Sequence, residues 1–434
     1  MARRKQFLGS ILMLSLHGYV AAEPELGKPD TGGQVVFVIE LAKRFSRLGY
    51  RVDVVTRKFE RQPEFDRIND GLQVWRIPYG GRRFIRKEDM HDYLSDFITN
   101  FLAAVRSRQI GYDVVNSHYW DAGWAGQKIA EELRIPHIHT PHSLGAWKRE
   151  GMEGESDPEE LEKRYRLEER IHKEFLTYRS CDHIIATTEE QLEVLQTEYD
   201  LPDKHISVIP PGVDENRFTP ARNLVRKELQ ERFEIGPYTI YAVGRMAKNK
   251  GYDLLIQSLP TVFKLVPEAE LLLAAGSDNS TRDREQETEL KKLAKDLGVH
   301  KKIRWERYIP DEDMADYYRA SAVFSLSSRY EPFGMTAIEA MACGTPTVIT
   351  THGGLYDLIE FGKHAMYADP TQPEEYGAIL AMPMRYPRLA EGLSNEGSRF
   401  ARRTFGWTGI ARRTLSIFDQ FKAVYAEQEQ ELEI

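Results

Sequence analysis

The sequence is poor in cysteine and has no excess of positive charge. Cys181 and Cys343 are the only cysteines among 434 residues, which argues against a disulfide framework or a cysteine-rich zinc site and favours a reducing compartment such as the cytoplasm. The net charge is -8, so no broad positive field attracts nucleic acid. Any anionic ligand must therefore be held by a local cluster of Lys and Arg.

The sequence also lacks a long apolar run. No stretch reaches the roughly 18–20 apolar residues that a bilayer-crossing helix needs, so we expect no membrane partner. The N-terminus alone has the order of a secretory signal, with basic residues 3–5, an apolar segment 7–16 and small residues at 20–22. We favour a first buried strand over a signal peptide, because Gly, Ser and His dilute the apolar segment and a glycine loop at 30–33 follows where a strand-to-helix turn belongs.

What the sequence does contain is a regular alternation of strand-like and helix-like segments. Residues 32–49 place apolar side chains at helical spacing, residues 50–56 form a short strand pattern, and the alternation restarts after Gly236. Such alternation is typical of a mainly parallel, doubly wound α/β sheet. The expected strands are 7–16, 50–56, 72–78, 112–118, 136–140, 182–188, 205–213, 238–244, 269–276, 303–308, 322–327, 345–350 and 365–369. The expected helices are 32–49, 122–133, one from about 158 to 180, 251–263, 286–298, 312–320, 335–343 and 407–428.

The chain is too long for one hydrophobic core, so two domains are expected. The proline- and turn-rich segment 210–220 is the best boundary. We predict two Rossmann-like domains, residues 1–212 and 213–406, that face a cleft and bind ligands at the carboxyl ends of their strands. The amphipathic segment 407–428 is expected to pack back on the first domain.

Two carboxylates bracket an apolar helix start near the C-terminal third of the chain. Glu331 and Glu339 stand eight positions apart around the turn that leads to Gly334. A helix starting there points free backbone N–H groups and the positive end of its dipole toward an anionic ligand. Glu339 has small, apolar neighbours, and an unpaired buried carboxylate is costly. The alternative is that Glu331 caps the helix and Glu339 is solvated.

A basic loop and a glycine loop complete the patterns typical of a phosphate site. Arg245 and Lys250 follow a predicted strand in GRMAKNKG (244–251), where two cations form a local basic cluster that could hold an anionic ligand. A solvated basic loop is the alternative. Gly32 and Gly33 let the backbone approach a phosphate or sugar without a Cβ in the way.

No metal site is expected. His137 and His139 form an H-x-H pattern, but strand alternation explains them as one face of a strand, and no Cys or acidic partner stands at ligand spacing. The acidic run 311–313 follows a proline and opens a helix. We interpret it as Asp311 at the N-cap with acidic residues in the first turn, so neither metal nor another cofactor is expected.

Three stretches together resemble a known family: GGQ (32–34), VGRMAKNKG (243–251) and EPFGMTAIEAMACGTPTV (331–348). They look like retaining nucleotide-sugar glycosyltransferases of the GT-B fold. Further motifs narrow the resemblance to the branch of sucrose synthases, sucrose-phosphate synthases and mannosylfructose-phosphate synthases, the last being the best match. These motifs are SLHGY (15–19), DTGGQVV (30–36), SHYWDAG (117–123), HTPHSLG (139–145) and SVIPPGVD (207–214). The resemblance runs through most of the chain in family order.

The resemblance implies roles for individual residues. Arg245 and Lys250 would neutralise the donor diphosphate, Glu331 would meet the transferred hexose and Glu339 the ribose diol. His142 would contact the reacting sugar. The further donor-binding residues would be Gly33, Phe333, Gly334, Met335 and Thr336. The sugar-phosphate acceptor would be held by Gly33, Gln34, Lys87, Tyr119, Lys148 and Arg170, with Arg164 nearby. The convergence of Lys87, Lys148 and Arg170 is an expectation, because they lie far apart in sequence.

The reaction that the resemblance implies is transfer of a hexosyl group from a nucleoside diphosphate sugar to fructose 6-phosphate, with retention at the anomeric carbon. The departing diphosphate would take the acceptor proton, so no protein nucleophile is expected. GDP-mannose is favoured as donor, with UDP-glucose, as in sucrose-phosphate synthases, as the alternative. A separate phosphatase would act on the product.

Two rival classes of protein would require other features. A dinucleotide-dependent dehydrogenase would need G-x-G-x-x-G after the first strand, which the residues around 30–37 do not supply. A noncatalytic sugar-binding protein would keep the fold without turnover, and the intact set of Arg245, Lys250, Glu331 and Glu339 argues against it.

Overall fold

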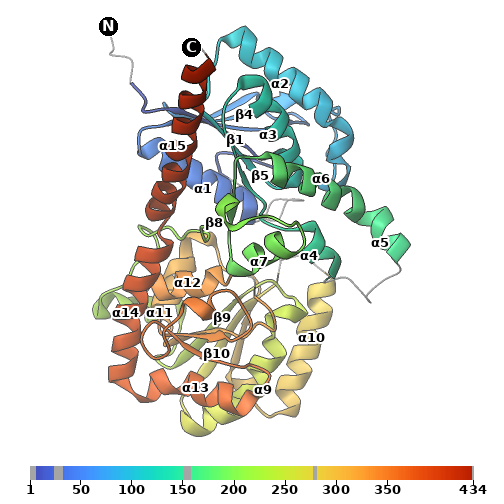
Figure 1. The fold of residues 1–434 in the computed structure, drawn as a ribbon. Helices are drawn as coiled ribbons and strands as arrows, with labels where there is room; N and C mark the ends of the chain where they lie inside the picture. The colour runs from blue at the N-terminus through green and yellow to red at the C-terminus, as the bar shows by residue number, and fades with distance from the viewer. Residues whose placement is uncertain (1–5, 24–32, 151–157, 277–280, 332, 433–434) are drawn as a thin grey trace. The chain divides into compact units, whose positions relative to one another are not determined.

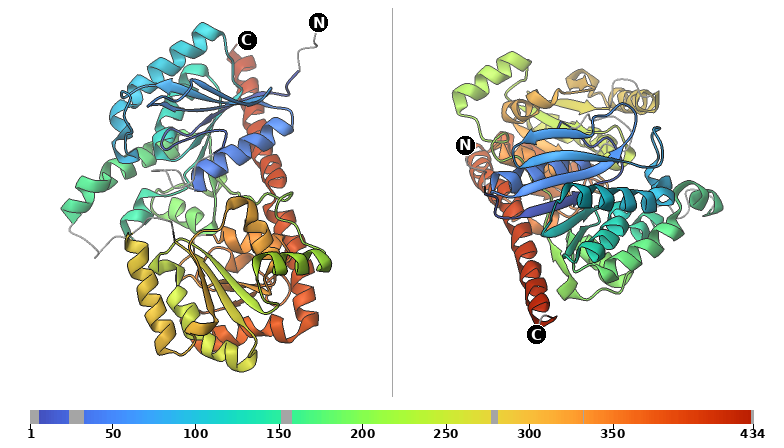
Figure 2. Two further views of the ribbon diagram at one scale, coloured as in Figure 1. Left: turned by 180° about the vertical axis from the view of Figure 1, so that it is seen from behind. Right: turned by 90° about the horizontal axis from the view of Figure 1, so that it is seen from above.

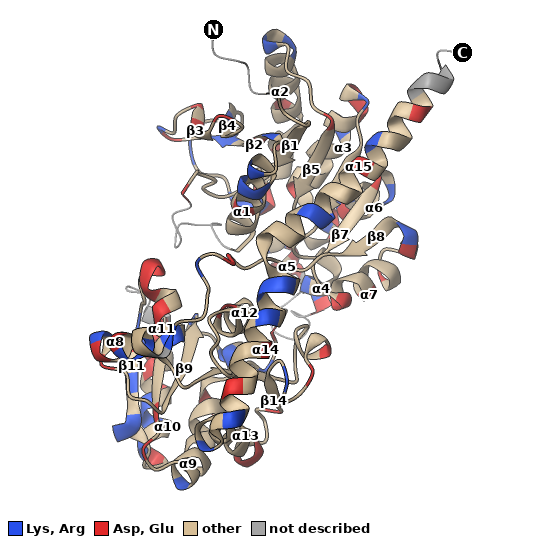
Figure 3. Cartoon of the chain, turned by 90° about the vertical axis from the view of Figure 1, so that its left-hand side faces the viewer, with Lys and Arg blue, Asp and Glu red and all other residues tan. Residues whose placement is uncertain are grey.

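The computed structural model describes residues 6–23, 33–150, 158–276, 281–331 and 333–432 (Figure 1). It divides the chain into two compact units, one formed by Met1–Pro211 with Trp407–Ile434 and the other by Gly212–Gly406. The division falls one residue before the expected boundary and assigns the C-terminal helix to the first unit. Lys and Arg are interspersed with Asp and Glu along the helices of both units (Figure 3).

Within the described residues, the first unit contains an eight-stranded sheet in the order β3-β4-β2-β1-β5-β6-β7-β8. All neighbouring strands are parallel except β3 and β4, which are antiparallel. The strands are β1 (Ser10–Leu14), β2 (Arg51–Lys58), β3 (Phe65–Asn69), β4 (Leu72–Pro78), β5 (Val114–His118), β6 (His137–Thr140), β7 (His183–Ala186) and β8 (Ile206–Val208). In β1, Ile11 and Met13 face one hydrophobic core while Leu12 and Leu14 face another, so both faces of the sheet are covered.

Helices cover both faces of this sheet (Figure 2). They are α1 (Gly33–Arg47), α2 (Leu94–Arg108), α3 (Trp120–Leu133), α4 (Gly145–Glu150), α5 (Pro158–Tyr165), α6 (Leu167–Ser180), α7 (Glu189–Thr197) and α15 (Trp407–Leu432), with short 3-10 helices η1 (Lys87–Tyr93) and η2 (Asp203–His205). The C-terminal α15 packs on α1, because Trp407 meets Phe37 edge to face at 5.1 Å and Phe418 lies 5.6 Å from Phe45 between ring centroids. Even this 26-residue helix lacks the apolar stretch that a bilayer span requires, as do the other described helices.

The second unit contains a parallel sheet of six described strands in the order β11-β10-β9-β12-β13-β14. They are β9 (Thr239–Gly244), β10 (Glu270–Ala275), β11 (Ile303–Glu306), β12 (Val323–Leu326), β13 (Thr347–Thr350) and β14 (Met366–Ala368). Alternate residues again serve two cores, with Ile240 and Ala242 on one face of β9 and Tyr241 on the other.

The helices of the second unit flank this sheet. They are α8 (Asn223–Phe233), α9 (Tyr252–Leu265), α10 (Thr281–Asp296), α11 (Met314–Ala320), α12 (Met335–Ala342), α13 (Pro373–Arg385) and α14 (Pro387–Phe405), with 3-10 helices η3 (Lys248–Lys250), η4 (His300–Lys302), η5 (Asp311–Asp313) and η6 (Tyr356–Leu358). Leucines and isoleucines of α9 fill the core on one face of the sheet, and α11 and α12 close the core on the other.

The continuous helix expected between 158 and 180 is wrong. Arg166 adopts a left-handed conformation (φ 50°, ψ 47°), which separates α5 from α6. A non-glycine residue is uncommon in this region of φ/ψ space, and arginine gives no local signal for it.

Candidate active site

A paired lysine and glutamate lie where β9 and β12 of the second unit end. Lys250 Nζ is 2.5 Å from Glu331 Oε2, and the Ser328 hydroxyl donates to the same oxygen at 2.9 Å. The Glu331 backbone N–H donates to the carbonyl of His352 at 3.0 Å. Glu331 therefore does not cap α12, whose N-cap position is Gly334. Its carboxylate is instead fixed by a cation and a hydroxyl.

A glycine holds the basic loop against the segment that carries Glu331. Gly251 has φ 63°, and a Cβ built on it would collide with the Ser327 carbonyl oxygen. Any other residue would thus be strained by both its backbone conformation and its contact. The Ser327 hydroxyl also donates to the Lys250 carbonyl at 3.1 Å. These contacts set the separation between Lys250 and Glu331.

Arg245 lies in the same loop and is exposed, as is Lys248. No hydrogen bond or ion pair involves Arg245 among the described residues. The buried Tyr252 hydroxyl likewise has no hydrogen-bond partner in the described part of the chain. Burial raises the pKa of Tyr252, the Glu331 charge adds to the rise and the Arg245 charge opposes it. Tyr252 is thus a neutral donor beside the predicted phosphate residues, and sequence reasoning missed it because a tyrosine at a helix start carries no distinctive signal.

The start of α12 has the geometry expected of an anion-binding end. Gly334 has φ 90° and precedes the helix, and the first backbone bonds run from Ala337 to Gly334 at 3.0 Å. The amides of Met335 and Thr336 therefore have no acceptor within the helix. Phe333 is buried and packs edge to face on Phe405, with ring centroids 5.5 Å apart, which anchors the turn.

Glu339 lies further along α12 and is not the solvated side chain of the alternative hypothesis. The Tyr318 hydroxyl donates to its Oε2 at 2.9 Å. Burial raises the pKa of Glu339 to about 7, although the bond from Tyr318 and the charge of Arg217 lower it; the Asp311 charge adds to the rise. The carboxylate is thus held in surroundings that favour its neutral form.

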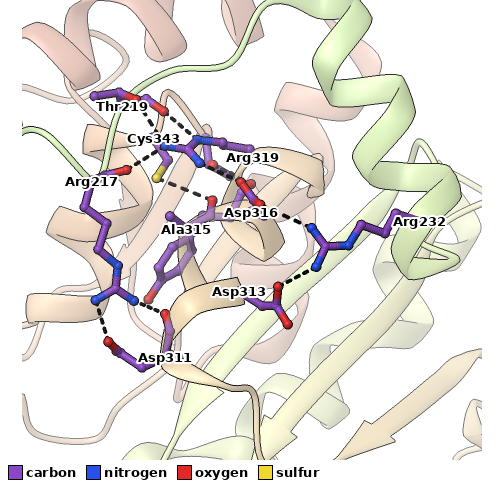
Figure 4. Close-up of polar contacts among 11 residues, drawn as sticks. Arg217, Thr219, Arg232, Asp311, Asp313, Ala315, Asp316, Arg319 and Cys343 are labelled. Carbon is purple, nitrogen blue, oxygen red and sulfur yellow. Dashed lines mark hydrogen bonds and ion pairs between the residues drawn. The ribbon is translucent and has the colours of Figure 1, made fainter.

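The prediction for the acidic run 311–313 is wrong in its detail. Asp311 is not an N-cap: Pro310 occupies the cap position of η5 and no side chain caps α11. Instead, Asp311 pairs with Arg217 at 2.7 Å and Asp313 pairs with Arg232 at 2.8 Å (Figure 4). Among the described residues no group of three His, Cys, Asp or Glu side chains comes together as a metal site would require.

In the first unit, the predicted residues of the glycine loop are only partly described. Gly32 and the rest of 30–32 lie outside the described residues. Gly33 begins α1 and is exposed, and a Cβ built on it meets no described atom within 4 Å. Gln34 Nε2 donates to the Ser15 hydroxyl and to the His118 carbonyl, both at 3.4 Å. Gln34 therefore links the start of α1 to the carboxyl ends of β1 and β5.

His142 is held as a neutral ring. Its Nε2 lies 2.9 Å from His118 Nδ1, and Phe37 packs against it edge to face with ring centroids 4.9 Å apart. Burial, together with the nearby His17, lowers the pKa of His142 to about 3. The other two histidines, His137 and His139, both bond the Ser117 hydroxyl, at 2.6 and 2.8 Å. They share one face of β6, as strand alternation predicted.

Two of the predicted acceptor residues contact each other inside the first unit. Arg170 is 2% exposed, and its guanidinium donates to Glu174 at 2.7 Å, to the Tyr119 hydroxyl at 3.2 Å and to the Ser143 carbonyl at 2.8 Å. Burial raises the pKa of Tyr119, and the positive charges of Arg170 and Lys87 oppose that rise. Lys148 Nζ lies 4.0 Å from the centre of the Tyr165 ring.

The pair formed by Arg170 and Glu174 had a signal in the sequence. Residues four positions apart on a helix face each other, and opposite charges there commonly pair. Glu174 is fully buried, and it also accepts from the Gly145 amide at 2.8 Å and from the Tyr199 hydroxyl. Arg170 is therefore tied to the interior of the unit.

Comparisons with known proteins agree with this arrangement. Residues 225–399 match the family described as glycosyl transferases group 1, residues 31–217 match glycosyltransferase family 4, and residues 3–55 match the sucrose synthase first GT-B domain. The chain is 50% identical to mannosylfructose-phosphate synthase of Agrobacterium fabrum over 94% of its own length and 91% of that protein. The chain belongs to the GT-B glycosyltransferases.

The chain is also similar to other glycosyltransferases. It is 32% identical to the D-inositol 3-phosphate glycosyltransferase of Xylanimonas cellulosilytica, over 94% of this chain and 96% of that one. Its structure matches sucrose-phosphate synthase from Thermosynechococcus elongatus with a TM-score of 0.76 and 25% identity, covering 96% and 100% of the two chains. The prediction of an α/β fold with two Rossmann-like domains is confirmed, and so is that of a hexosyltransferase.

Proposed function

We propose that this enzyme transfers a hexosyl group from a nucleoside diphosphate sugar to fructose 6-phosphate with retention at the anomeric carbon, and that GDP-mannose is the donor. The observation that carries the proposal is the Lys250–Glu331 pair, with 2.5 Å between Nζ and Oε2, formed by a loop that also carries the exposed Arg245 at the end of a parallel sheet. The 50% identity to a mannosylfructose-phosphate synthase supports the choice of acceptor and donor hexose. UDP-glucose is the alternative donor, which the similarity to a sucrose-phosphate synthase supports.

The chemistry assigned to the second unit is stabilisation of a leaving group. Negative charge grows on the departing diphosphate, and Arg245 and Lys250 supply fixed positive charge for it, so we assign no metal to the step. The ion pair with Glu331 holds Lys250 in place. Glu331 would accept from the hexose hydroxyls, and Glu339 in its ionised form would accept from the ribose diol. The first-turn amides of Met335 and Thr336 add donors for oxygen atoms of the ligand.

The first unit would receive the acceptor. The neutral ring or the backbone of His142 would contact the reacting sugar, while Gln34, Lys87, Tyr119 and Lys148 would hold the sugar phosphate. Arg170 would act at least in part by fixing the Tyr119 hydroxyl, to which it donates at 3.2 Å. The departing diphosphate would remove the proton of the acceptor hydroxyl, so no side chain is assigned as nucleophile. A separate phosphatase would dephosphorylate the product, and a cytoplasmic location fits these substrates.

The test is a matrix of two donors and two acceptors. GDP-mannose and UDP-glucose are each offered with fructose and with fructose 6-phosphate, in EDTA, and nucleoside diphosphate release is measured. We expect turnover with GDP-mannose and fructose 6-phosphate, at least a hundredfold faster than with fructose. NMR of the product would report the anomeric configuration.

Each cell of the matrix addresses one part of the proposal. Equal rates with fructose and its phosphate would contradict the assignment of Lys87 and Lys148. Faster turnover with UDP-glucose would select the alternative donor. Activity that returns only when a divalent metal is added would contradict the proposed metal-free step.

A further inference from the structure

The short helix η1 carries Lys87 and is tied to the rest of the first unit by an arginine outside the predicted site. Arg166 donates to Asp92 through both terminal nitrogens, at 2.9 and 2.8 Å, and its Nη1 lies 3.4 Å from the Glu88 carbonyl. A bidentate arginine–carboxylate pair fixes orientation as well as distance. Arg166 therefore holds η1 at two points, one on each side of its middle turn.

The backbone of Arg166 also separates α5, which contacts Lys148, from α6, which carries Arg170. It occupies the left-handed conformation between α5 and α6. On one side, the Tyr165 ring contacts Lys148. On the other side, the backbone N–H of Arg170 in α6 donates to the Arg166 carbonyl at 3.0 Å. One residue thus lies at the junction of the three segments that place Lys87, Lys148 and Arg170.

A second tie joins η1 to the start of α3. The His91 ring stacks on Trp120 with 3.7 Å between ring centroids and 22° between planes. Both His91 nitrogens are buried without a hydrogen-bond partner among the described residues. Burial, together with the charges of Lys173, Arg166 and Arg170, lowers the pKa of His91 to about 2, so the ring is neutral and packs as a flat aromatic group. Since Tyr119 directly precedes Trp120, this stack holds Lys87 close to Tyr119.

From these contacts we infer that Arg166 is a positioning residue, which, with the His91–Trp120 stack, fixes Lys87 for a phosphorylated acceptor. The inference rests on the proposed function, because it assigns a purpose to the site for the sugar phosphate. A lysine has a long, flexible stem, so part of the binding free energy is lost in ordering it. Anchoring the backbone of η1 reduces that loss. The Arg166–Asp92 pair is partly exposed, at 29% and 53%, and Arg166 also pairs with Glu169 at 2.6 Å. Such a pair contributes little to the stability of the whole unit, so its loss should act mainly on the segment that it orients.

The first test is steady-state kinetics of Arg166→Ala with GDP-mannose and fructose 6-phosphate. We expect the KM for fructose 6-phosphate to rise about tenfold, while kcat and the KM for GDP-mannose stay within twofold. Arg166→Lys keeps the charge but not the bidentate contact, so its KM for fructose 6-phosphate should lie between those of the wild type and Arg166→Ala. In the Lys87→Ala background, Arg166→Ala should add less than a twofold rise, because its effect passes through Lys87.

Arg179, at the other end of α6, provides a matched control. Arg179 of α6 pairs with Asp200 at 2.6 Å, away from η1, and Arg179→Ala should leave the KM for fructose 6-phosphate unchanged. His91→Phe keeps a flat ring and loses no hydrogen bond, so it should keep a low KM, whereas His91→Ala should raise it. Thermal unfolding of each variant checks that it is folded.

The outcomes separate this inference from the proposed function. An unchanged KM in Arg166→Ala, or full additivity with Lys87→Ala, would overturn the positioning role while leaving the reaction intact. Wild-type enzyme that fails to turn over fructose 6-phosphate with either GDP-mannose or UDP-glucose would refute the proposed function and the inference together. An equal rise in the KM for GDP-mannose would show a general structural effect and would also count against the positioning role.

Discussion

Two glutamates, the fully buried Glu174 of the first unit and the half-buried Glu339 of the second, are stabilised in different ways. Glu174 in the first unit accepts from Arg170, from the Gly145 amide and from the Tyr199 hydroxyl. Glu339 in the second unit accepts from one side chain among the described residues, the Tyr318 hydroxyl, and burial raises its pKa to about 7. A carboxylate with a full set of partners stabilises the fold, whereas one that lacks them costs free energy and is a candidate for ligand binding.

Two arginines, Arg170 of the first unit and Arg245 of the second, also differ in how many protein partners they have. Arg170 is 2% exposed and its guanidinium is bonded to protein atoms at Nε, Nη1 and Nη2. Arg245 is exposed and makes no hydrogen bond or ion pair within the described chain. Both were predicted from the sequence as ligand-binding residues. The comparison indicates that Arg170 serves mainly to organise its unit, while Arg245 has its charge available for a ligand.

The largest expected effect breaks the buried pair of the first unit. Glu174→Gln leaves the Arg170 charge buried without its counterion, and breaking such a pair typically costs about 3–5 kcal/mol of stability. Urea unfolding should show this loss. The matched variant is Glu339→Gln, which replaces a poorly paired carboxylate with a neutral group and should leave the stability at pH 8 unchanged or higher. A loss below about 1 kcal/mol in Glu174→Gln would mean that the pair is not structural.

The next effect concerns catalysis. Lys250→Ala removes a fixed cation from the leaving group, and the loss of one such group commonly lowers kcat by about 10²–10³. The side chains of Lys250 and Glu331 are only 18% and 11% exposed, so urea unfolding is measured beside turnover to separate a loss of stability from the loss of catalysis. Lys248→Ala, in the same short helix, is the control and should keep normal turnover. Equal turnover in the two variants would contradict the leaving-group role.

The sequence predicted the fold because strand and helix periodicities are local. The central strands appear within a few residues of their expected bounds, for example β4 at Leu72–Pro78. The strand β3 (Phe65–Asn69) was not predicted, since it is short, polar and paired only at the sheet edge. The break between α5 and α6 was missed because the left-handed conformation of Arg166 depends on contacts with η1, far away in sequence.

The sequence identified the residues of the candidate site better than the side chains with which they pair. Motifs indicated Glu331 and Lys250, and the structure brings them together across 81 positions. Asp311 was assigned to a helix cap because its partner Arg217 lies 94 positions away and left no local pattern. Tyr252 was missed, because its role depends on the absence of a hydrogen-bond partner in the described structure, which no sequence pattern reports.

The smallest expected effect tests the pKa of Glu339. Because the folded-state pKa, about 7, lies above the ordinary value of 4.5, the folded protein binds this proton more tightly than the unfolded chain does. The stability due to this group is therefore full below about pH 4.5 and is lost as pH rises toward 7. Only the ionised carboxylate accepts from a ribose diol at both oxygens, so kcat/KM for the donor should rise with pH through about 7.

Tyr318→Phe sharpens this comparison, because the Tyr318 hydroxyl favours the ionised form of Glu339. A hydrogen bond to a charged group is worth about 1.5 kcal/mol and one pKa unit corresponds to about 1.4 kcal/mol. The rising limb of the kcat/KM profile should therefore move up by about one pH unit, with the plateau at high pH nearly unchanged. Glu339→Gln should abolish the limb, which makes it the control. Tyr318→Phe could leave the midpoint of the kcat/KM profile in place while Glu339→Gln still removes its rising limb. In that case the Tyr318 hydroxyl does not set the pKa of Glu339, and the comparison with the fully bonded Glu174 loses its hydrogen-bonding argument.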